Sequence, residues 1–356
     1  MLLILMRRKT SIVYSKGRKD HKENERSIYM VDPIKPFIEY QGVFIVDGGL
    51  ATELEWRGYD LADELWSARL LLEEPEAIRQ VHSDYLWQGA DCVISASYQA
   101  TIPGLMRRGL SAAAAADLLR LSVRLAQAAR DAFWAVETNR VGRLRPLVAA
   151  SIGPYGAYLA DGSEYTGDYS LSAAELAEWH RPRWRILAES GADLLACETI
   201  PSWEEAQALA ALLRETPQMP AWVSFSARDG THISDGTPVA QCAALLDTIP
   251  NVVAVGVNCT PPYLMPDLIT AVQSATNKYI IVYPNSGERY DVVHKCWRGD
   301  TDPSEYGTIS REWRKMGAAL IGGCCRTRPA HIRQIRDRTP EPRIARMKRM
   351  GADKNQ

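Results

Sequence analysis

The stretch GADLLACETIPS, residues Gly191 to Ser202, carries the pattern that decides the fold. A glycine suited to the left-handed end of a helix is followed by a short apolar run, Asp193 to Thr199, which is too short for a helix of its own. The run stops at a polar pair, Glu-Thr, and Ser202 with Glu205 predicts a capping box that opens the next helix. The stretch therefore indicates one buried strand between two helices.

The same kind of run recurs along the chain. Continuous apolar character without alternation is typical of strands covered on both faces, as in parallel sheets. The eight runs are Val43 to Asp47, Asp91 to Ser97, Leu147 to Gly153, Asp193 to Thr199, Ala221 to Ala227, Val252 to Cys259, Tyr279 to Asn285 and Ala318 to Cys324. Gly89 and Gly317 precede runs as Gly191 does. Eight strands that alternate with helices predict a single (β/α)8 barrel of the TIM type.

A doubly wound open sheet is the alternative, since an error of one or two strands in this count would favour it. That fold usually carries a GxGxxG motif after its first strand. Here Asp47-Gly48-Gly49 stands in that place, which favours the barrel.

The charge balance separates the body of the chain from its ends. The 356 residues hold 42 basic and 43 acidic side chains, which argues against nucleic acid or an anionic membrane as the main partner. Residues 1–38 have nine basic and four acidic side chains, and residues 339–356 have five and two. We therefore expect a basic extension (1–38), disordered over most of residues 1–30, a barrel (39–338) and a basic tail (339–356).

The cellular location is predicted from segments that the sequence lacks. No run approaches the roughly 18 apolar residues of a membrane span, and the opening MLLILM is too short for a secretory signal. Seven cysteines form an odd number, which a disulfide scaffold does not predict. The sequence thus predicts a cytoplasmic protein whose thiols are free to bind metal or react.

Three of these thiols are expected to meet at the catalytic end of the barrel. Function in such barrels collects where the strands stop, and the sixth and eighth runs stop at Cys259 and at Cys324-Cys325, on either side of the seventh. Gly322-Gly323 would let the backbone turn so that two successive sulfurs face one centre. The pattern predicts a three-thiolate zinc site.

Two other interpretations of the cysteines stay open. Buried free cysteines are common in cores, and Cys92, Cys197 and Cys242 lie within apolar stretches and are read in this way. A disulfide between Cys324 and Cys325 would leave Cys259 unexplained.

The composition of the predicted site indicates its chemistry. No fourth ligand follows at the close spacing of a structural zinc site, so an open position typical of catalytic zinc is expected. Three thiolates leave the ion with a net charge of −1, which makes it poor at activating water and suited to holding a substrate thiol as thiolate. The same charge favours a cationic alkyl donor, a sulfonium or a quaternary ammonium.

These motifs resemble those of the homocysteine S-methyltransferase family, and most closely its bacterial S-methylmethionine-dependent members. The resemblance covers about residues 40–337. The stretches that carry it are DGGLATELEWRG (Asp47–Gly58), SASYQAT (Ser95–Thr101), SIGPYGAYLADGSEY (Ser151–Tyr165), LLACETIP (Leu194–Pro201), SDGTP (Ser234–Pro238), GVNC (Gly256–Cys259), VYPNSGE (Val282–Glu288) and IGGCCRT (Ile321–Thr327).

The resemblance implies roles for the carboxylates at two strand ends. It assigns zinc to the three cysteines, the amino group of homocysteine to Glu198, and a substrate contact near zinc to Asp47. A salt-bridged strand end is the plain structural alternative for Glu198, and an Asx turn beside Gly48-Gly49 is the alternative for Asp47.

Four further residues are candidates for contacts with substrate. In betaine-dependent members a tyrosine after the second strand can take the open zinc position, and here Tyr98 and Gln99 are the residues nearby. Asn258 and Asn285 are expected either to bind the amino-acid part of the substrate, to orient zinc thiolates, or only to cap the next helix.

The predicted function is zinc-dependent transfer of a methyl group from S-methylmethionine to homocysteine, with S-adenosylmethionine as a possible second donor. A betaine-dependent homocysteine methyltransferase and a non-catalytic zinc-binding or amino-acid-binding barrel are the alternatives. A zinc hydrolase is disfavoured because it would prefer His or carboxylate ligands. The oligomeric state is not predicted.

Overall fold

A computed structural model describes residues 32–61, 66–287, 289–291, 296–298 and 302–339 of the chain. Eight parallel strands form one sheet, and each predicted apolar run contains one of them. They are β1 (Phe44–Ile45), β2 (Cys92–Ile94), β3 (Leu147–Ile152), β4 (Leu194–Ile200), β5 (Ala221–Phe225), β6 (Val252–Asn258), β7 (Tyr279–Tyr283) and β10 (Ala318–Ile321).

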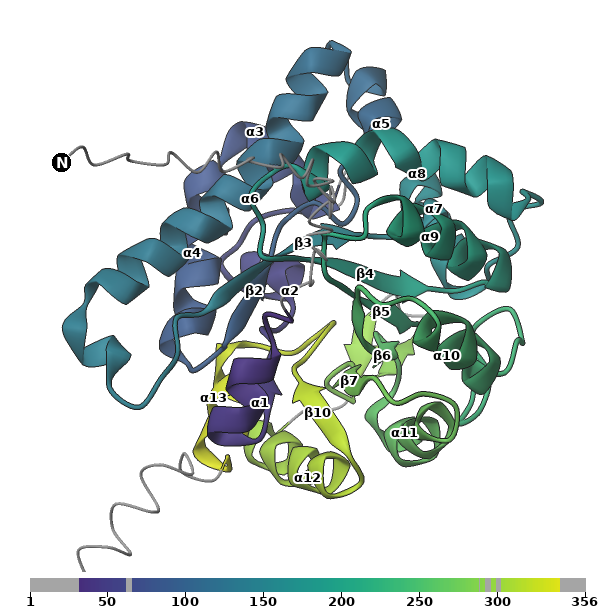
Figure 1. The fold of residues 1–356 in the computed structure, drawn as a ribbon. Coiled ribbons are helices and arrows are strands. Elements are labelled where there is room, and N and C mark those ends of the chain that lie inside the picture. The colour runs from purple at the N-terminus through teal and green to yellow at the C-terminus, as the bar shows by residue number, and fades with distance from the viewer. Residues whose placement is uncertain (1–31, 62–65, 288, 292–295, 299–301, 340–356) are drawn as a thin grey trace, which may run out of the picture.

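The sheet closes on itself as a barrel. Its strand order is β1-β10-β7-β6-β5-β4-β3-β2, and a parallel bridge between Val46 and Cys92 joins the two ends. Figure 1 shows the strands at the centre of the molecule with the helices outside them. The predicted (β/α)8 barrel is confirmed, and the open sheet is excluded.

Helices follow most of the strands and cover the barrel. The α-helices are α1 (Lys35–Gln41), α2 (Leu50–Trp56), α3 (Leu70–Glu73), α4 (Pro75–Trp87), α5 (Ile102–Arg107), α6 (Ala112–Ala135), α7 (Tyr155–Leu159), α8 (Ala173–Ala188), α9 (Trp203–Glu215), α10 (Val239–Asp247), α11 (Met265–Gln273), α12 (Pro303–Lys315) and α13 (Pro329–Asp337). Short 3-10 helices are η1 (Trp66–Arg69), η2 (Glu137–Arg140), η3 (Ser163–Tyr165) and η4 (Pro262–Leu264). Among the described residues, no helix is long and apolar enough to cross a membrane. The cytoplasmic location stays a prediction.

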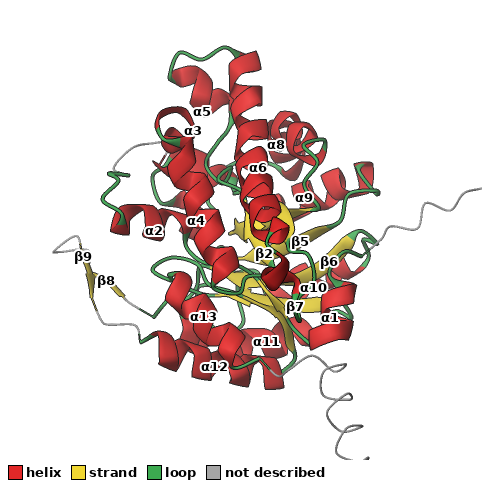
Figure 2. Cartoon of the chain, turned by 90° about the vertical axis from the view of Figure 1, so that its left-hand side faces the viewer, coloured by secondary structure: helices red, strands yellow, loops and turns green. Residues whose placement is uncertain are grey.

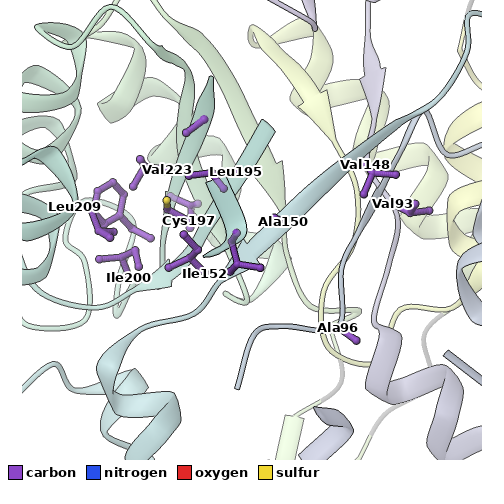
Figure 3. Close-up of a cluster of buried hydrophobic side chains, with 14 of the residues drawn as sticks. Val93, Ala96, Val148, Ala150, Ile152, Leu195, Cys197, Ile200, Leu209 and Val223 are labelled. Atoms are coloured by element: carbon purple, nitrogen blue, oxygen red, sulfur yellow. The ribbon is translucent and has the colours of Figure 1, made fainter. Parts of the chain in front are cut away.

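The strands are buried on both faces, as their continuous apolar character predicts. Outward-facing side chains such as Val148, Leu195 and Val223 pack against residues of the helices in one large cluster (Figure 3). Inward-facing side chains such as Ala149 and Trp222 fill the barrel in a second cluster. Burial of this apolar surface is the main stabilising contribution expected for the fold.

Helix α1 belongs to the barrel although its first residues lie within the extension predicted to reach residue 38. Ile34 and Phe37 join the cluster inside the barrel, at the end where the strands begin. The ring of Phe37 meets that of Phe44, the first residue of β1, edge to face at 4.9 Å. The packed barrel therefore includes residues before 39, because these two apolar side chains fill its base. Residues 1–31 and 340–356 lie outside the described residues.

The predicted helix ends are confirmed in part. Gly89, Gly191 and Gly317 all have left-handed φ angles, of 109°, 82° and 114°. Ser202 caps α9 by accepting from the N–H of Glu205, but the Glu205 carboxylate does not return to Ser202. The predicted capping box is therefore wrong, because this carboxylate is buried and bound elsewhere.

The chain leaves the barrel after β7. The strands β8 (Arg289–Asp291) and β9 (Cys296–Arg298) pair antiparallel as a separate two-stranded sheet. They stand apart from the barrel in Figure 2, beyond the ends of the helices. The sequence analysis did not predict this hairpin.

Candidate metal and substrate site

A cavity of about 440 Å³ opens at the carboxyl ends of the strands. Most of the strand ends contribute a lining residue, as the barrel predicts. The strand-end residues in its lining are Asp47, Ile94, Ser95, Glu198, Thr199, Cys259, Tyr283, Gly323, Cys324 and Cys325. The cavity thus brings together all three predicted zinc ligands with Asp47 and Glu198.

The three cysteines form one compact group. Their Sγ atoms all lie within 4.8 Å of one another, and those of Cys259 and Cys325 are 3.5 Å apart. Among the described residues, these three cysteines are the one group of three or more His, Cys, Asp or Glu side chains close enough together to hold a metal ion. The predicted meeting of β6 and β10 residues across β7 is therefore present in the structure.

The backbone positions these sulfurs through hydrogen bonds across β7. Cys259 follows the last residue of β6 with a left-handed φ of 47°, and its N–H donates to the Tyr283 carbonyl. The N–H of Cys324 donates to the Pro284 carbonyl, 2.8 Å away. The left-handed backbone conformation of Cys259 is rare for residues other than glycine, and such residues cluster at functional sites.

The two glycines before Cys324 allow close packing of the backbone against its neighbours. Neither has a positive φ. A Cβ at Gly322 would lie 2.8 Å from the Cβ of Val46, and one at Gly323 would lie 2.3 Å from Thr327 Oγ1. A side chain at either position would clash with these neighbours, so both positions require glycine.

Hydrogen bonds among the thiols separate their pKa values. Hydrogen bonding with Cys324 and Cys325 lowers the pKa of Cys259 well below its ordinary value despite its burial. The same bonds raise the pKa values of Cys324 and Cys325. The group thus favours one thiolate and offers soft, anionic sulfur donors.

Glu198 is a buried carboxylate inside the mouth of the barrel. It accepts a hydrogen bond from the Ser151 hydroxyl. Burial raises its pKa from the ordinary value to about 7, and the hydroxyls of Ser151 and Tyr283 lower it by less. It makes no ion pair among the described residues, so the salt-bridged alternative is not what the structure has.

Asp47 is buried beside Glu198. Its carboxylate accepts from the N–H of Ile94 at 2.9 Å. Burial raises its pKa well above the ordinary value, and the charge of Glu198 raises it further. The carboxylate therefore ties β1 to β2 and does not form the Asx turn that was the alternative.

The two asparagines do not line the cavity. Asn258 is fully buried and accepts from the N–H of Thr199 and the hydroxyl of Ser224, while its own NH₂ donates to Thr199 Oγ1 at 2.7 Å. Its NH₂ also lies 3.9 Å from Cys324 Sγ, which fits a role in orienting a thiol. The side-chain oxygen of Asn285 is buried without a hydrogen-bond partner.

A tyrosine that the sequence analysis did not name as a candidate contacts one of the cysteines. Tyr98 and Gln99 line the cavity, and the Gln99 side chain donates to the Ala157 carbonyl at 3.1 Å. The Tyr165 hydroxyl, however, lies 3.5 Å from Cys259 Sγ, and its neighbour Glu164 also lines the cavity. Both residues are on η3, well past the end of β3, so attention to strand ends alone missed them. The signal available was an acidic-aromatic pair in the glycine-rich stretch after β3.

Comparison with known proteins gives one consistent result. The family model described as homocysteine S-methyltransferase matches residues 44–339. The chain is similar to homocysteine S-methyltransferase YbgG of Bacillus subtilis (55% identity, 86% of this chain, 97% of the relative) and to homocysteine S-methyltransferase of Escherichia coli (48%, 86% and 99%).

Solved structures agree with these sequences. The homocysteine methyltransferase MmuM of Escherichia coli covers 86% of this chain and 100% of its own, with TM-scores of 0.79 in its oxidized form and 0.78 in its metallated form. The sequence identities of these two alignments are 45% and 46%.

Proposed function

The chain belongs to the homocysteine S-methyltransferase family, and from this premise we propose that it transfers a methyl group from S-methylmethionine to homocysteine with zinc held by Cys259, Cys324 and Cys325. The family match and the curated relatives make it a methyltransferase that acts on homocysteine. The identity of the metal, the donor and the roles of single residues are the parts proposed here.

The observation that carries the proposal is the group of three thiols on the cavity wall. Zinc–sulfur bonds of about 2.3 Å in a tetrahedron place sulfurs about 3.8 Å apart, and the Sγ atoms here, all within 4.8 Å of one another, fit that arrangement. All three residues line the cavity, so a fourth position would face it. When bound there, zinc would hold the sulfur of homocysteine as a thiolate at neutral pH. The metallated form of the related MmuM supports a metal in this family.

Glu198 would receive the ammonium group of homocysteine. Its raised pKa reflects a buried carboxyl group without a cation beside it. A substrate ammonium would supply that cation and restore the charged form. Asp47, whose charge is coupled to that of Glu198, would add to the negative potential around the same amino group.

The transfer itself needs no acid or base for the leaving group. The homocysteine sulfur forms a bond to the methyl carbon while the bond from that carbon to the donor sulfonium breaks. The electron pair of the broken bond stays on the donor sulfur, which leaves as a neutral thioether. The thiol proton is released when homocysteine binds. One methionine is the donor after loss of its methyl group, and the second is the methylated homocysteine.

The test is methionine formation by the purified chain with homocysteine and, in turn, S-methylmethionine, S-adenosylmethionine or betaine. S-methylmethionine should give the highest kcat/KM, activity should disappear with a zinc chelator, and added zinc should restore it. A highest kcat/KM with betaine would overturn the donor assignment. Failure of all three donors with zinc-loaded, folded protein would overturn the proposed reaction.

A further inference from the structure

The 3-10 helix η3 lies over the thiol group and forms part of the cavity wall. Gly162, Glu164 and Tyr165 line the cavity together with the three cysteines. The Tyr165 hydroxyl reaches to 3.5 Å from Cys259 Sγ, while 50% of the residue's surface is exposed. An aromatic ring is therefore presented to whatever enters the cavity near Cys259.

Glu164 places a carboxylate in the cavity wall with no cationic side chain of the described residues paired to it. Its Oε2 atom is buried and has no hydrogen-bond partner, and Glu164 makes no ion pair within the described part of the chain. Burial raises its pKa above the ordinary value. A buried carboxylate oxygen left without a partner is costly, and a cationic ligand would remove that cost.

The backbone holds this carboxylate in place. A Cβ at Gly156 would lie 2.3 Å from the N atom of Glu164, so the loop crosses α7 at a point where a glycine is required. The Glu164 carbonyl accepts from the Ser226 hydroxyl at 3.2 Å, and the N–H of Gly167 donates to the Ser163 carbonyl at 2.8 Å. Glu164 and Tyr165 are thus positioned from both sides before a ligand arrives.

The charges around the cavity favour a cation. Four carboxylates line it (Asp47, Glu55, Glu164 and Glu198) and only Arg326 among the lining residues carries a guanidinium group, which lies 3.9 Å from the carboxylate of Glu55. If homocysteine uses Glu198, on the side of β4, the carboxylate of Glu164 is left for a second cationic molecule. A methyl donor must approach the thiol group from the cavity, where Tyr165 lies against Cys259.

We propose that Glu164 and Tyr165 form the donor-binding site, in which the carboxylate receives the ammonium group of a sulfonium amino acid and the ring faces its sulfonium. This inference rests on the function proposed above. Cations within about 6 Å of an aromatic ring are attracted to its face. A donor with both a sulfonium and a protonated amine satisfies both residues, whereas betaine has no N–H to donate to Glu164.

The first experiment compares Glu164→Gln with Asp168→Asn, which removes an exposed carboxylate on the same loop that does not line the cavity. In Glu164→Gln the KM for S-methylmethionine should rise about tenfold or more, because a charge-assisted hydrogen bond is lost. The KM for homocysteine should change less than about twofold. Asp168→Asn should keep the wild-type KM for both S-methylmethionine and homocysteine.

Dimethylsulfoniopropionate, a sulfonium without an amino group, serves as the matched probe in competition with S-methylmethionine. Its inhibition constant should change little in Glu164→Gln, since it never made the ammonium contact. An equal weakening of both sulfonium compounds, or a rise in the homocysteine KM instead, would overturn the assignment of Glu164.

The second experiment separates the ring of Tyr165 from its hydroxyl. Tyr165→Phe keeps the ring and should retain the donor KM, whereas Tyr165→Leu should raise that KM by about 2- to 30-fold. Equal loss in both variants would show that the hydroxyl near Cys259 matters rather than the ring. Absence of methyl transfer from S-methylmethionine in the wild type would instead contradict the proposed function.

Discussion

At the scale of single residues, the main feature of the cavity is its buried carboxylates. Asp47 and Glu198 have raised pKa values because burial outweighs the hydrogen bonds that each accepts. Each would gain from a nearby cation, and an amino-acid substrate brings one in its ammonium group. Burial disfavours the charged form of both carboxylates, and we expect a bound ammonium group to offset this. The site should therefore prefer substrates that carry an amino group.

Glu198→Gln should keep the shape of the site and remove its charge. A charge-assisted hydrogen bond of roughly 1.5 to 3 kcal/mol would weaken, which corresponds to a loss of about 10- to 150-fold in kcat/KM for homocysteine. Metal content should not change. The measurement is steady-state kinetics with homocysteine and with 4-mercaptobutyrate, which lacks the amino group. The same factor of loss with both acceptors would rule out the ammonium contact.

The dependence of kcat/KM for homocysteine on pH should reflect the ionisation of Glu198. Below about pH 7 the carboxyl group is protonated and cannot receive a charged ammonium, and above it the carboxylate forms. The ratio of kcat/KM between the wild type and Glu198→Gln should therefore rise between about pH 6 and about pH 8. Taking the ratio removes the contribution of thiol ionisation, which both proteins share. A flat ratio would contradict the role of this ionisation.

At the scale of elements, the ends of β4 and β6 are fixed to each other by one amide. Thr199 follows Glu198 with a left-handed φ of 62°, which is unusual for a β-branched residue. Asn258 bonds both the N–H and the hydroxyl of Thr199. The amide thereby holds Glu198 and Cys259, the next residue after Asn258, in a common arrangement.

A buried network connects the helices outside the barrel to the loop after β2. Glu205 accepts from the N–H of Tyr155 at 2.6 Å and from Nε2 of His180 at 2.7 Å. Burial lowers the pKa of His180, so its neutral ring can accept at Nδ1 from Arg183. Arg183 also donates to the carbonyl of Tyr98 at the cavity wall. Helices α8 and α9 thus support the substrate-facing loop.

Glu205→Ala should lower the free energy of unfolding by about 3 to 5 kcal/mol, because removal of one partner leaves the rest of a buried charged network unpaired. The neighbouring Glu204→Ala is the control, since Glu204 is exposed and its loss should cost less than about 0.5 kcal/mol. Urea unfolding of the two variants measures both values. If the urea midpoints of Glu205→Ala and Glu204→Ala were similar, the network would contribute little to the free energy of unfolding.

The elements were more predictable than their ends. Continuous apolar runs identified all eight barrel strands because burial on both faces leaves a strong local signal. The partner of a side chain leaves no such signal. Glu205 matches a capping box locally but bonds His180, 25 residues away, and Tyr165 reaches Cys259 across 94 residues. Sequence reasoning found the cysteines and Glu198 at strand ends, and missed residues brought in by a loop.

At the scale of the whole molecule, the two basic ends remain assigned by composition alone. Residues 1–30 are expected to lie outside the folded body, whereas α1 places Ile34 and Phe37 inside the base of the barrel. Deletion of residues 1–30 should therefore leave kcat/KM and the melting temperature nearly unchanged. Deletion of residues 1–41 should lower the melting temperature, because about 1.5 to 3 kcal/mol is lost for each buried side chain removed. A large loss of activity in the shorter deletion, with the fold intact, would contradict this boundary.

The central claim is that three cysteines from two strand ends hold one zinc ion at the catalytic end of the barrel. Metal analysis of the purified chain and of four single variants tests it most directly. We predict about one zinc per chain in the wild type and in Cys92→Ala, whose thiol is buried inside the barrel away from the group. Cys259→Ala, Cys324→Ala and Cys325→Ala should each lose the metal while remaining folded. Full zinc content in any one of these three would contradict the site.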